Sequence, residues 1–293
     1  MSALKLIRAH EKDLGGGFVV RRALPAAAQR SVGPFIFFDH FGPTVRKPTD
    51  NFDVRPHPHI GLATVTYLFE GAMMHRDSLN NVQRIEPGAI NWMTAGRGIV
   101  HSERGPEDLR DAPYRIHGLQ LWTALPLADE ECEPAFTHTP ASAIPQFHGA
   151  GFNARVLIGN AYGLLSPVAT FAETLYVDIE ASAGATIELP AASERALYCI
   201  SGELQLSGEN VQPLQFVVLD VDATRVVATA DARFVIIGGA AVDAYRHIYW
   251  NFVSSRTERI EQAKNDWRAQ RFAAVPGETE FIPLPDDQRR PTA

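Results

Sequence analysis

Two short segments in the first half of the chain each place two potential metal ligands one residue apart. The first segment holds His57 and His59, and the second holds His101 and Glu103. Alternate side chains of an extended chain point to the same face, so each segment can direct both ligands into one barrel interior. Three imidazoles and one carboxylate suit Fe(II), and by ligand type they also suit Mn, Ni, Cu or Zn. Four protein ligands on an octahedral ion leave two positions for water, dioxygen or a substrate oxygen.

The His57–His59 pair is weak evidence by itself, because ten histidines in 293 residues produce such spacings by chance. The segments between the two pairs strengthen it: Gly71, Glu86–Gly88 and Gly96–Gly98 supply turn and close-approach signals. These signals predict a barrel that brings the two pairs together. The alternative is that the histidines are satisfied by hydrogen bonds at a barrel mouth.

The elements that must position these ligands are strands. From residue 17 to about 238, short β-type runs such as 63–69 and 216–219 alternate with Gly, Pro, Asn and Asp. This spacing predicts an all-β barrel or sandwich. Helix signals are confined to the C-terminus, where Ser255 and Glu258 form a capping box and Ile260, Ala263 and Trp267 share one face. We expect that helix to pack on a barrel.

The two halves of the chain have comparable strand content, and residues 139–146 between them have the composition of a linker. Tyr67–Gly71 in the first half has a counterpart in Tyr198–Gly202 in the second, which predicts that one β unit occurs twice. The predicted domains are therefore a metal-binding domain (1–139), a second β domain (147–240), and a helix with the tail (241–293).

Composition excludes several classes of protein. A net charge of −7 without a basic run argues against direct binding to nucleic acid. Cys132 and Cys199 cannot form a disulfide framework and are expected to be buried small hydrophobic residues. No apolar run is long enough to span a bilayer, so the sequence predicts no membrane contact and a cytoplasmic location.

Several stretches of the first half, together with the end of the chain, resemble the pirin family. They are 33–43, 57–61, 64–67, 75–78, 92–96, 98–103, 259–267 and 276–283. The resemblance implies a bicupin, an all-β fold of two tandem cupin (double-stranded β-helix, or jelly-roll) barrels with a C-terminal helical tail. It also implies one metal ion per chain, iron, held by His57, His59, His101 and Glu103.

The second half lacks this ligand set. When the spacings of the first half are applied around Gly202, the ligand positions fall on Glu188, Pro190, Ala232 and Phe234. No histidine occurs between His148 and His247. We therefore expect the second barrel to be structural and to bind no metal through such ligands.

Other residues of the first half have less certain roles. His75 and Asp77 are expected either at the mouth of the cavity or on the surface of a hairpin. His40, beside Asp39, is expected to be an orienting or structural residue. Trp92 and Met93 lie in a predicted barrel strand and are candidates to wall an apolar substrate pocket.

Two functions are compatible with the four ligands. The first is a dioxygenase that opens the ring of a flavonol such as quercetin, an activity reported for pirins. In this function Glu103 would be both a metal ligand and the general base. The alternative is a non-enzymatic, redox-sensitive regulator that binds a transcription factor or a metabolic enzyme, as pirins are also described to do. Both need the same metal site, so the sequence leaves both open.

Overall fold

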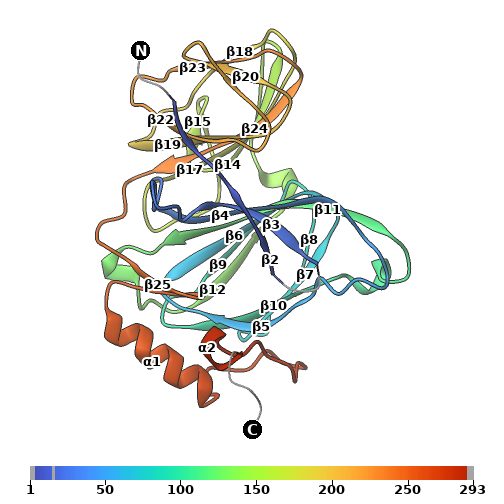
Figure 1. The fold of residues 1–293 in the computed structure, drawn as a ribbon, viewed down its shortest axis with the longest axis vertical. Coiled ribbons are helices and arrows are strands. Elements are labelled where there is room, and N and C mark those ends of the chain that lie inside the picture. The colour runs from blue at the N-terminus through green and yellow to red at the C-terminus, as the bar shows by residue number, and fades with distance from the viewer. Residues whose placement is uncertain (1–3, 15–16, 289–293) are drawn as a thin grey trace. The chain divides into compact units, whose positions relative to one another are not determined.

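Strands are the predominant regular secondary structure in the computed structural model, which describes residues 4–14 and 17–288 (Figure 1). The helices of the described residues are α1 (Thr257–Arg268), α2 (Pro285–Gln288) and three single-turn 3-10 helices, η1 (Glu107–Leu109), η2 (Leu127–Asp129) and η3 (Ala141–Ala143). The all-β prediction with a C-terminal helix is therefore confirmed.

Contacts within the chain fall into two compact units. The first contains the residues up to Lys12, Arg21–Asp39 and Thr139–Val242. The second contains Asp13–Val20, His40–His138 and the residues from Asp243 onward. The first strand of the chain, β1 (Lys5–Ile7), thus pairs within the unit formed mainly by the second half. The domain limits 1–139, 147–240 and 241–293 stay a prediction.

The first unit contains two sheets around one apolar core. The larger sheet has the order β1, β22, β19, β24, β17, β14, β13, and the smaller has the order β18, β23, β20, β21. The core joins Val177 and Leu197 of the larger sheet to Ile187, Leu204 and Val226 of the smaller. The bounds of these strands are β13 (Gln146–Gly149), β14 (Phe152–Ile158), β17 (Thr174–Ala181), β18 (Thr186–Glu188), β19 (Glu194–Ser201), β20 (Leu204–Leu206), β21 (Glu209–Val211), β22 (Phe216–Leu219), β23 (Arg225–Ala228) and β24 (Ala232–Gly239).

The second unit contains the strands that carry the predicted ligands. In one sheet β12, β9, β6, β11 and β4 are successive neighbours, and a four-stranded sheet has the order β5, β10, β7, β8. The bounds are β4 (Phe35–Arg46), β5 (Val54–His59), β6 (Leu62–Glu70), β7 (Met73–Asp77), β8 (Val82–Ile85), β9 (Ile90–Thr94), β10 (Ile99–Arg104), β11 (Tyr114–Ala124) and β12 (Ala135–Thr139). The remaining strands are β2 (His10–Asp13), β3 (Val19–Leu24), β15 (Asn160–Ala161), β16 (Leu164–Leu165), β25 (His247–Tyr249) and β26 (Phe252–Ser254).

The predicted repeat is present in the strand order. The order β5, β10, β7, β8 recurs as β18, β23, β20, β21, and β9, β6, β11, β4 recurs as β22, β19, β24, β17. The strand that matches β10 is therefore β23, whereas Ala232 and Phe234 lie on β24. The predicted positions of these two equivalents were wrong because the hairpins of the second half are shorter. Ile187 and Val226 pair across β18 and β23, and both are fully buried.

A tight turn at Gly61 joins β5 to β6. Gly61 has φ +69°, and a Cβ atom there would lie 2.0 Å from the carbonyl oxygen of Val253. Only glycine tolerates both the left-handed backbone and this close approach. The turn ends β5 just beyond His59, so β6 begins at Leu62. The β-branched and aromatic side chains of β6 then favour an extended conformation.

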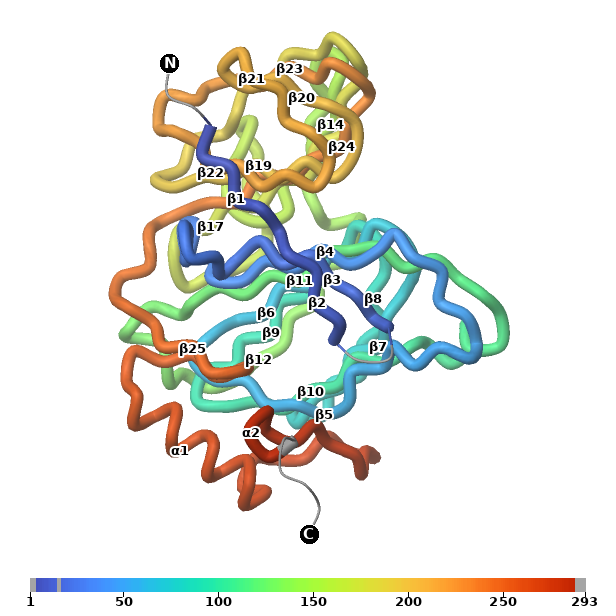
Figure 2. Tube along the Cα trace, viewed as in Figure 1, coloured from blue at the N-terminus to red at the C-terminus, as the bar shows by residue number. Residues whose placement is uncertain are grey.

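Helix α1 packs on the strands that carry the ligands, as expected. Its buried residues Ile260, Ala263 and Trp267 share a core with Ile60 and Val100, which follow or lie within β5 and β10. Figure 2 shows the red and orange tail passing beside β5 and β10. The helix therefore supports the outer side of the sheet.

The predicted capping box at the start of α1 was wrong. The helix begins at Thr257, its N-cap is Arg256, and no side chain caps it. The backbone N–H and the hydroxyl of Ser255 instead donate to the two carboxylate oxygens of Glu130, both at 2.7 Å. Hydrogen bonds to a charged carboxylate are stronger than those between neutral groups, and Ser255 contributes to this buried network.

Candidate metal centre

The three histidines converge because β5 and β10 are antiparallel neighbours. Their register pairs His101 with His57 and Ile99 with His59. Residues directly opposite each other on antiparallel strands share a face, as do residues two apart along one strand. His57, His59 and His101 therefore project to the same side of the sheet, as the sequence spacing predicts.

The imidazoles form a compact cluster. One nitrogen from each of the three rings lies within 4.8 Å of the corresponding nitrogens of the other two. The Nε2 atoms of His59 and His101 are 3.1 Å apart. The side chains are nearly enclosed, with His57 6% exposed and His59 and His101 each 2% exposed. Three convergent imidazoles at this spacing fit one transition-metal ion.

Hydrogen bonding fixes which nitrogen of His57 is available. Its Nδ1 lies 2.9 Å from the carbonyl oxygen of Arg55. A carbonyl can only accept, so Nδ1 carries the proton and donates it. The lone pair of His57 is then on Nε2, which is the arrangement that metal-binding histidines adopt.

Burial also keeps the cluster uncharged. It lowers the pKa of His57 to about 4 and the pKa values of His59 and His101 well below the ordinary value of 6.5. Neighbouring imidazoles within the cluster add to this effect for His59 and His101. All three rings are neutral at pH 7, so a metal ion has no protonated imidazole to displace.

Glu103 lies on the same strand as His101 but outside the histidine cluster. The register of β5 and β10 shifts between His101 and Glu103, so that Glu103 faces Val54. Its Oε1 atom is buried with no hydrogen-bond partner among the described residues. Burial raises the pKa of this carboxyl to about 7. A buried carboxylate oxygen without a donor is costly unless a cation or a proton satisfies it, which fits a nearby metal ion.

His75 and Asp77 lie beside the cluster and not on a hairpin surface. His75 is 2% exposed and Asp77 is fully buried. Their strand β7 pairs with β10 so that Asp77 faces His101 and His75 faces Glu103. Of the two alternatives, the cavity mouth and a hairpin surface, the hairpin surface is therefore wrong for both residues.

The apolar wall of the site contains one of the two predicted residues. Thr64 pairs with Met93 on β9 and with Trp122 on β11, so these three share a face. The Trp122 ring meets the His59 ring edge-on, with centroids 5.3 Å apart. Trp92 points to the opposite face of β9, because successive strand residues alternate. Trp122 was not identified from the sequence, since only the register of β6 and β11 reveals it.

His40 is not one of the three clustered histidines. It is fully buried, and its Nε2 is 2.7 Å from the Nε2 of His117. One of these nitrogens donates to the other. This arrangement agrees with the expected structural role of His40.

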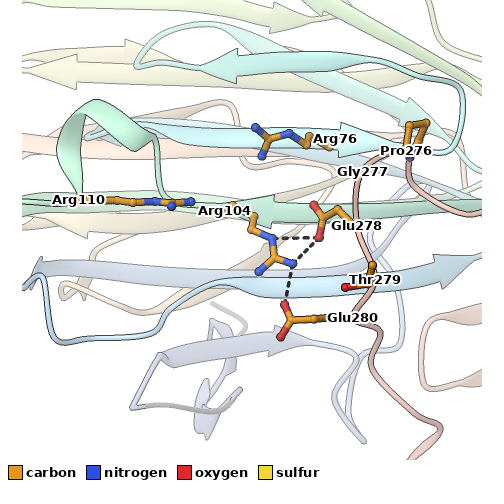
Figure 3. A pocket seen from close by; sticks show the side chains of 8 residues that line it. All are labelled: Arg76, Arg104, Arg110, Pro276, Gly277, Glu278, Thr279 and Glu280. Carbon is orange, nitrogen blue, oxygen red and sulfur yellow. Dashed lines mark hydrogen bonds and ion pairs between the residues drawn. The ribbon is translucent and has the colours of Figure 1, made fainter.

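A clamp from the C-terminal tail holds the outer face of β10, and it was not predicted from the sequence. Ser102 and Arg104 alternate with His101 and Glu103 and point the other way. Both donate to the carboxylate of Glu278, and Arg104 also donates to Glu280 at 3.0 Å. Figure 3 shows the Arg104 guanidinium linked to both glutamates. Arg104, Glu278 and Glu280 line a cavity of about 530 Å³ together with Arg76 and Arg110.

No helix among the described residues combines the length and apolar character needed to cross a bilayer. The two cysteines of the described chain are free. Cys199 is buried as expected, whereas Cys132 is partly exposed, so its predicted burial was wrong.

Comparison with known proteins relates both halves of the chain to one family. The family described as Pirin matches residues 17–123, and the one described as Pirin C-terminal cupin domain matches residues 176–273. The second match confirms that the second β unit is a cupin domain. The prediction of two cupin domains with a C-terminal helix therefore holds.

Individual relatives are similar over nearly the whole chain. A pirin-like protein of Caulobacter vibrioides is 45% identical over 283 residues, which span 95% of this chain and 98% of that protein. Human pirin is 32% identical over 272 residues, which span 89% of this chain and 90% of that protein. A crystal structure of quercetin 2,3-dioxygenase from Acinetobacter baumannii superposes with a TM-score of 0.89 at 31% identity, covering 96% of this chain and 95% of that one. The chain belongs to the pirin family.

Proposed function

We propose that the chain is a mononuclear metal protein that acts as an oxidoreductase of the quercetin 2,3-dioxygenase kind on a flavonol-like substrate. One divalent ion, Fe(II) in preference to Mn, Ni, Cu or Zn, is held by His57, His59, His101 and Glu103. The observation that carries this proposal is the buried cluster of three neutral imidazoles, together with a buried oxygen of Glu103, two residues beyond His101 on β10, that has no hydrogen-bond partner among the described residues. The similarity to the A. baumannii quercetin 2,3-dioxygenase over 96% of the chain supports the reaction class.

The bound ion would supply Lewis acidity and redox chemistry at an oxygen of the substrate. The remaining contributions come from the protein. Trp122 and Met93 give the site an apolar side that suits an aromatic ring. The enclosure of the three imidazoles excludes bulk water, which strengthens electrostatic interactions inside the site.

Glu103 is the residue that would move a proton. Its Oε1 accepts no hydrogen bond from the described residues, and burial raises the pKa of the carboxyl to about 7. A carboxylate with a pKa near the working pH is a suitable general base for the hydroxyl proton of a flavonol. In this proposal the oxygen that takes the proton is a carboxylate oxygen of Glu103.

Oxygen uptake with quercetin tests the enzymatic proposal. Iron-loaded protein is expected to consume dioxygen and to release carbon monoxide as the flavonol ring opens. His101→Ala should abolish both signals, whereas the matched control His148→Ala should leave them unchanged, since His148 lies on β13 and bonds only to Asn153 among the described residues. Iron-loaded protein that consumes no oxygen with quercetin would rule the flavonol proposal out.

The low exposure of the cluster favours a second candidate function, a redox-sensitive regulator that binds a protein partner. The three imidazoles are only 2–6% exposed, so a substrate of three rings reaches them only if the entrance opens. Oxidation of Fe(II) to Fe(III) would change the buried charge by one unit and bias the loops around it. This candidate fails if partner affinity is the same for the two oxidation states. Cytoplasmic location and absence of direct contact with nucleic acid belong to both proposals.

A further inference from the structure

A line of hydrogen-bonding groups runs from Asp77 to the histidine cluster. The Nε2 of His75 lies 2.9 Å from Oδ2 of Asp77, and the Nδ1 of His75 lies 3.3 Å from the Nδ1 of His101. The other nitrogen of His101, Nε2, faces the Nε2 of His59 at 3.1 Å. All of these groups are buried, so water does not compete for their hydrogen bonds.

Asp77 is fixed at the outer end of this line. Its Oδ1 accepts the backbone N–H groups of Leu79 at 2.9 Å and of Asn81 at 3.1 Å. The side-chain amide of Asn81 donates to both carboxylate oxygens. Backbone N–H groups are donors only, so the Oδ1 position must hold an acceptor. The orientation of the carboxylate is therefore set by the loop that follows β7.

The proton positions along the line follow from this end. The carboxylate of Asp77 accepts, so Nε2 of His75 donates. With its proton on Nε2, His75 presents the lone pair of Nδ1, which accepts from Nδ1–H of His101. The lone pair of His101 is consequently on Nε2, directed at the centre of the cluster.

Ring packing holds the middle of the line. The His75 ring stacks on the Phe136 ring with centroids 4.2 Å apart and planes 13° from parallel. The stacking leaves the imidazole little freedom to rotate, so its two nitrogens stay aimed at Asp77 and His101. The cross-strand pairing of Asp77 with His101 fixes the spacing between the two strands.

We propose that Asp77 and His75 are positioning residues that hold His101 in its Nδ1–H tautomer and direct its Nε2 lone pair to the metal ion. The proposal rests on the metal centre proposed above, but not on the flavonol reaction. Partners of this kind orient a ligand and raise its basicity, and their loss typically weakens metal binding by about 10- to 100-fold.

The substitution Asp77→Asn keeps the size and shape of the side chain nearly constant. It should reverse the donor and acceptor in each hydrogen bond from residue 77 through His75 to His101. The amide oxygen of the variant must stay at the Oδ1 position, because two backbone N–H groups point there. Its NH₂ group then occupies the Oδ2 position and donates to Nε2 of His75. His75 must carry its proton on Nδ1 and donate to His101, which leaves the proton of His101 on Nε2. That tautomer of His101 cannot bind a metal at Nε2.

The experiment measures the affinity of metal-free protein for Ni²⁺ and Fe²⁺ by calorimetry, and the histidine tautomers by ¹⁵N NMR. Wild-type protein should show His101 as Nδ1–H and His75 as Nε2–H. Asp77→Asn should invert both tautomers and weaken metal binding about 10- to 100-fold. His75→Phe keeps an aromatic ring against Phe136 but removes the acceptor, so it should also weaken binding.

A matched control is Asp178→Asn. Asp178 is also buried and charged, but it pairs with Arg233 in the other unit. This variant should lose stability and retain the affinity and tautomers of the wild type. Wild-type His101 found as Nε2–H, or Asp77→Asn with unchanged affinity, would overturn the positioning role. Wild-type protein that binds neither ion would overturn the metal centre itself, which separates the two failures.

Discussion

The imidazoles of His57, His59 and His101 are enclosed together, and the protonation state of each ring determines whether it can bind a metal ion. Burial lowers the pKa of all three, so the cluster is ready for a cation at neutral pH. Glu103 shows the opposite shift, because burial of a carboxylate favours its neutral form and raises its pKa to about 7. The carboxyl is therefore the group whose proton competes with a metal near neutral pH.

Metal affinity should consequently depend on pH through Glu103. Below pH 7 each metal ion must displace one proton from this carboxyl, so affinity should fall by about tenfold per pH unit down to roughly pH 5. His57, whose pKa is about 4, adds to the loss only at lower pH. Ni²⁺ titrations of metal-free protein between pH 5 and pH 8 measure this slope.

The substitution Glu103→Gln distinguishes the role of Glu103 as a metal ligand from the effect of its titrating proton. The variant should bind more weakly at pH 8, with a nearly flat pH dependence between pH 5.5 and pH 7 because no carboxyl proton remains to be displaced. A wild-type slope that persists in Glu103→Gln would assign the proton to another group.

Folding stability of the metal-free protein has two opposed contributions from the same residues. The pKa of Glu103 is raised in the folded state. The stabilising contribution of Glu103 to the free energy of unfolding is therefore present at low pH and is lost as pH rises through about 7. The pKa of His57 is lowered in the folded state. The stabilising contribution of His57 to the free energy of unfolding is therefore present above about pH 6.5 and is lost as pH falls through about 4.

The two cysteines should differ in reactivity. Cys199 is fully buried, and burial raises the pKa of its thiol to about 12. Cys132 is partly exposed, although burial and Asp129 also raise its pKa. Ellman's reagent at pH 8 should therefore titrate one thiol in the native protein and two after denaturation. Cys132→Ser should remove the native reaction; a second thiol reacting at the same rate in the native protein would contradict this burial.

Among the elements, β10 carries the site on one face and its support on the other. His101 and Glu103 project inward, whereas Ser102 and Arg104 bind Glu278 on the outside. Helix α1 and the tail also pack behind Val100 and Ile60. The strand is thus held from behind, while its inner face carries His101 and the buried Oε1 of Glu103, which has no hydrogen-bond partner among the described residues.

Removal of the clamp should affect both stability and metal binding. The side chain of Glu278 is 8% exposed, and its partner Arg104 is 16% exposed. Glu278→Ala leaves Arg104 with fewer partners and should lower the free energy of unfolding by about 1–3 kcal/mol. Metal affinity should fall as well, because the ligands on β10 lose their fixed spacing. Chemical denaturation and Ni²⁺ titration measure the two effects.

Glu280→Ala is the matched control for the clamp. Glu280 also binds Arg104, but its side chain is 55% exposed. Its removal should change stability by less than about 0.5 kcal/mol. Equal effects of the two substitutions would show that the tail does not act through Glu278.

Across the whole molecule, one strand arrangement is used twice with different interiors. The pairing of His57 with His101 across β5 and β10 corresponds in strand order to the pairing of Ile187 with Val226 across β18 and β23. Apolar side chains fill the second interior and contribute roughly 1.5–3 kcal/mol each when fully buried. The first interior instead contains polar groups, which cost stability unless they are satisfied.

Metal binding should therefore stabilise the whole protein. An ion that binds only the folded state adds about 2.7 kcal/mol when its concentration is 100 times the dissociation constant. Ni²⁺ or Fe²⁺ should raise the melting temperature of the wild type and of His148→Ala, but not of His101→Ala. Equal shifts in all three proteins would place the binding elsewhere.

The sequence was sufficient for the features that depend on local spacing. The His57–His59 spacing, the strands around 63–69 and 216–219, and the buried face of α1 follow from periodicity alone. The repeat was also detectable, since its turn signals recur. These features share one property, namely that neighbouring residues determine them.

Features that depend on register or on distant segments could not be predicted. The contact of His75 with His101 requires the pairing of β7 with β10, and the choice of Met93 over Trp92 as the residue on the side of the site requires the pairing of β9 with β6. Glu278 meets Arg104 only because the tail returns to β10. Ser255 failed as a helix cap because Glu130, which is far away in the sequence, binds it.

The most direct test of the metal centre is the anomalous X-ray signal of crystals grown from protein purified with iron. At the iron absorption edge, one peak per chain should lie within bonding distance of Nε2 of His57, His59 and His101 and of a carboxylate oxygen of Glu103. Crystals of His101→Ala should lack this peak. An iron peak bound by other residues, or an empty histidine cluster in iron-replete protein, would contradict the account.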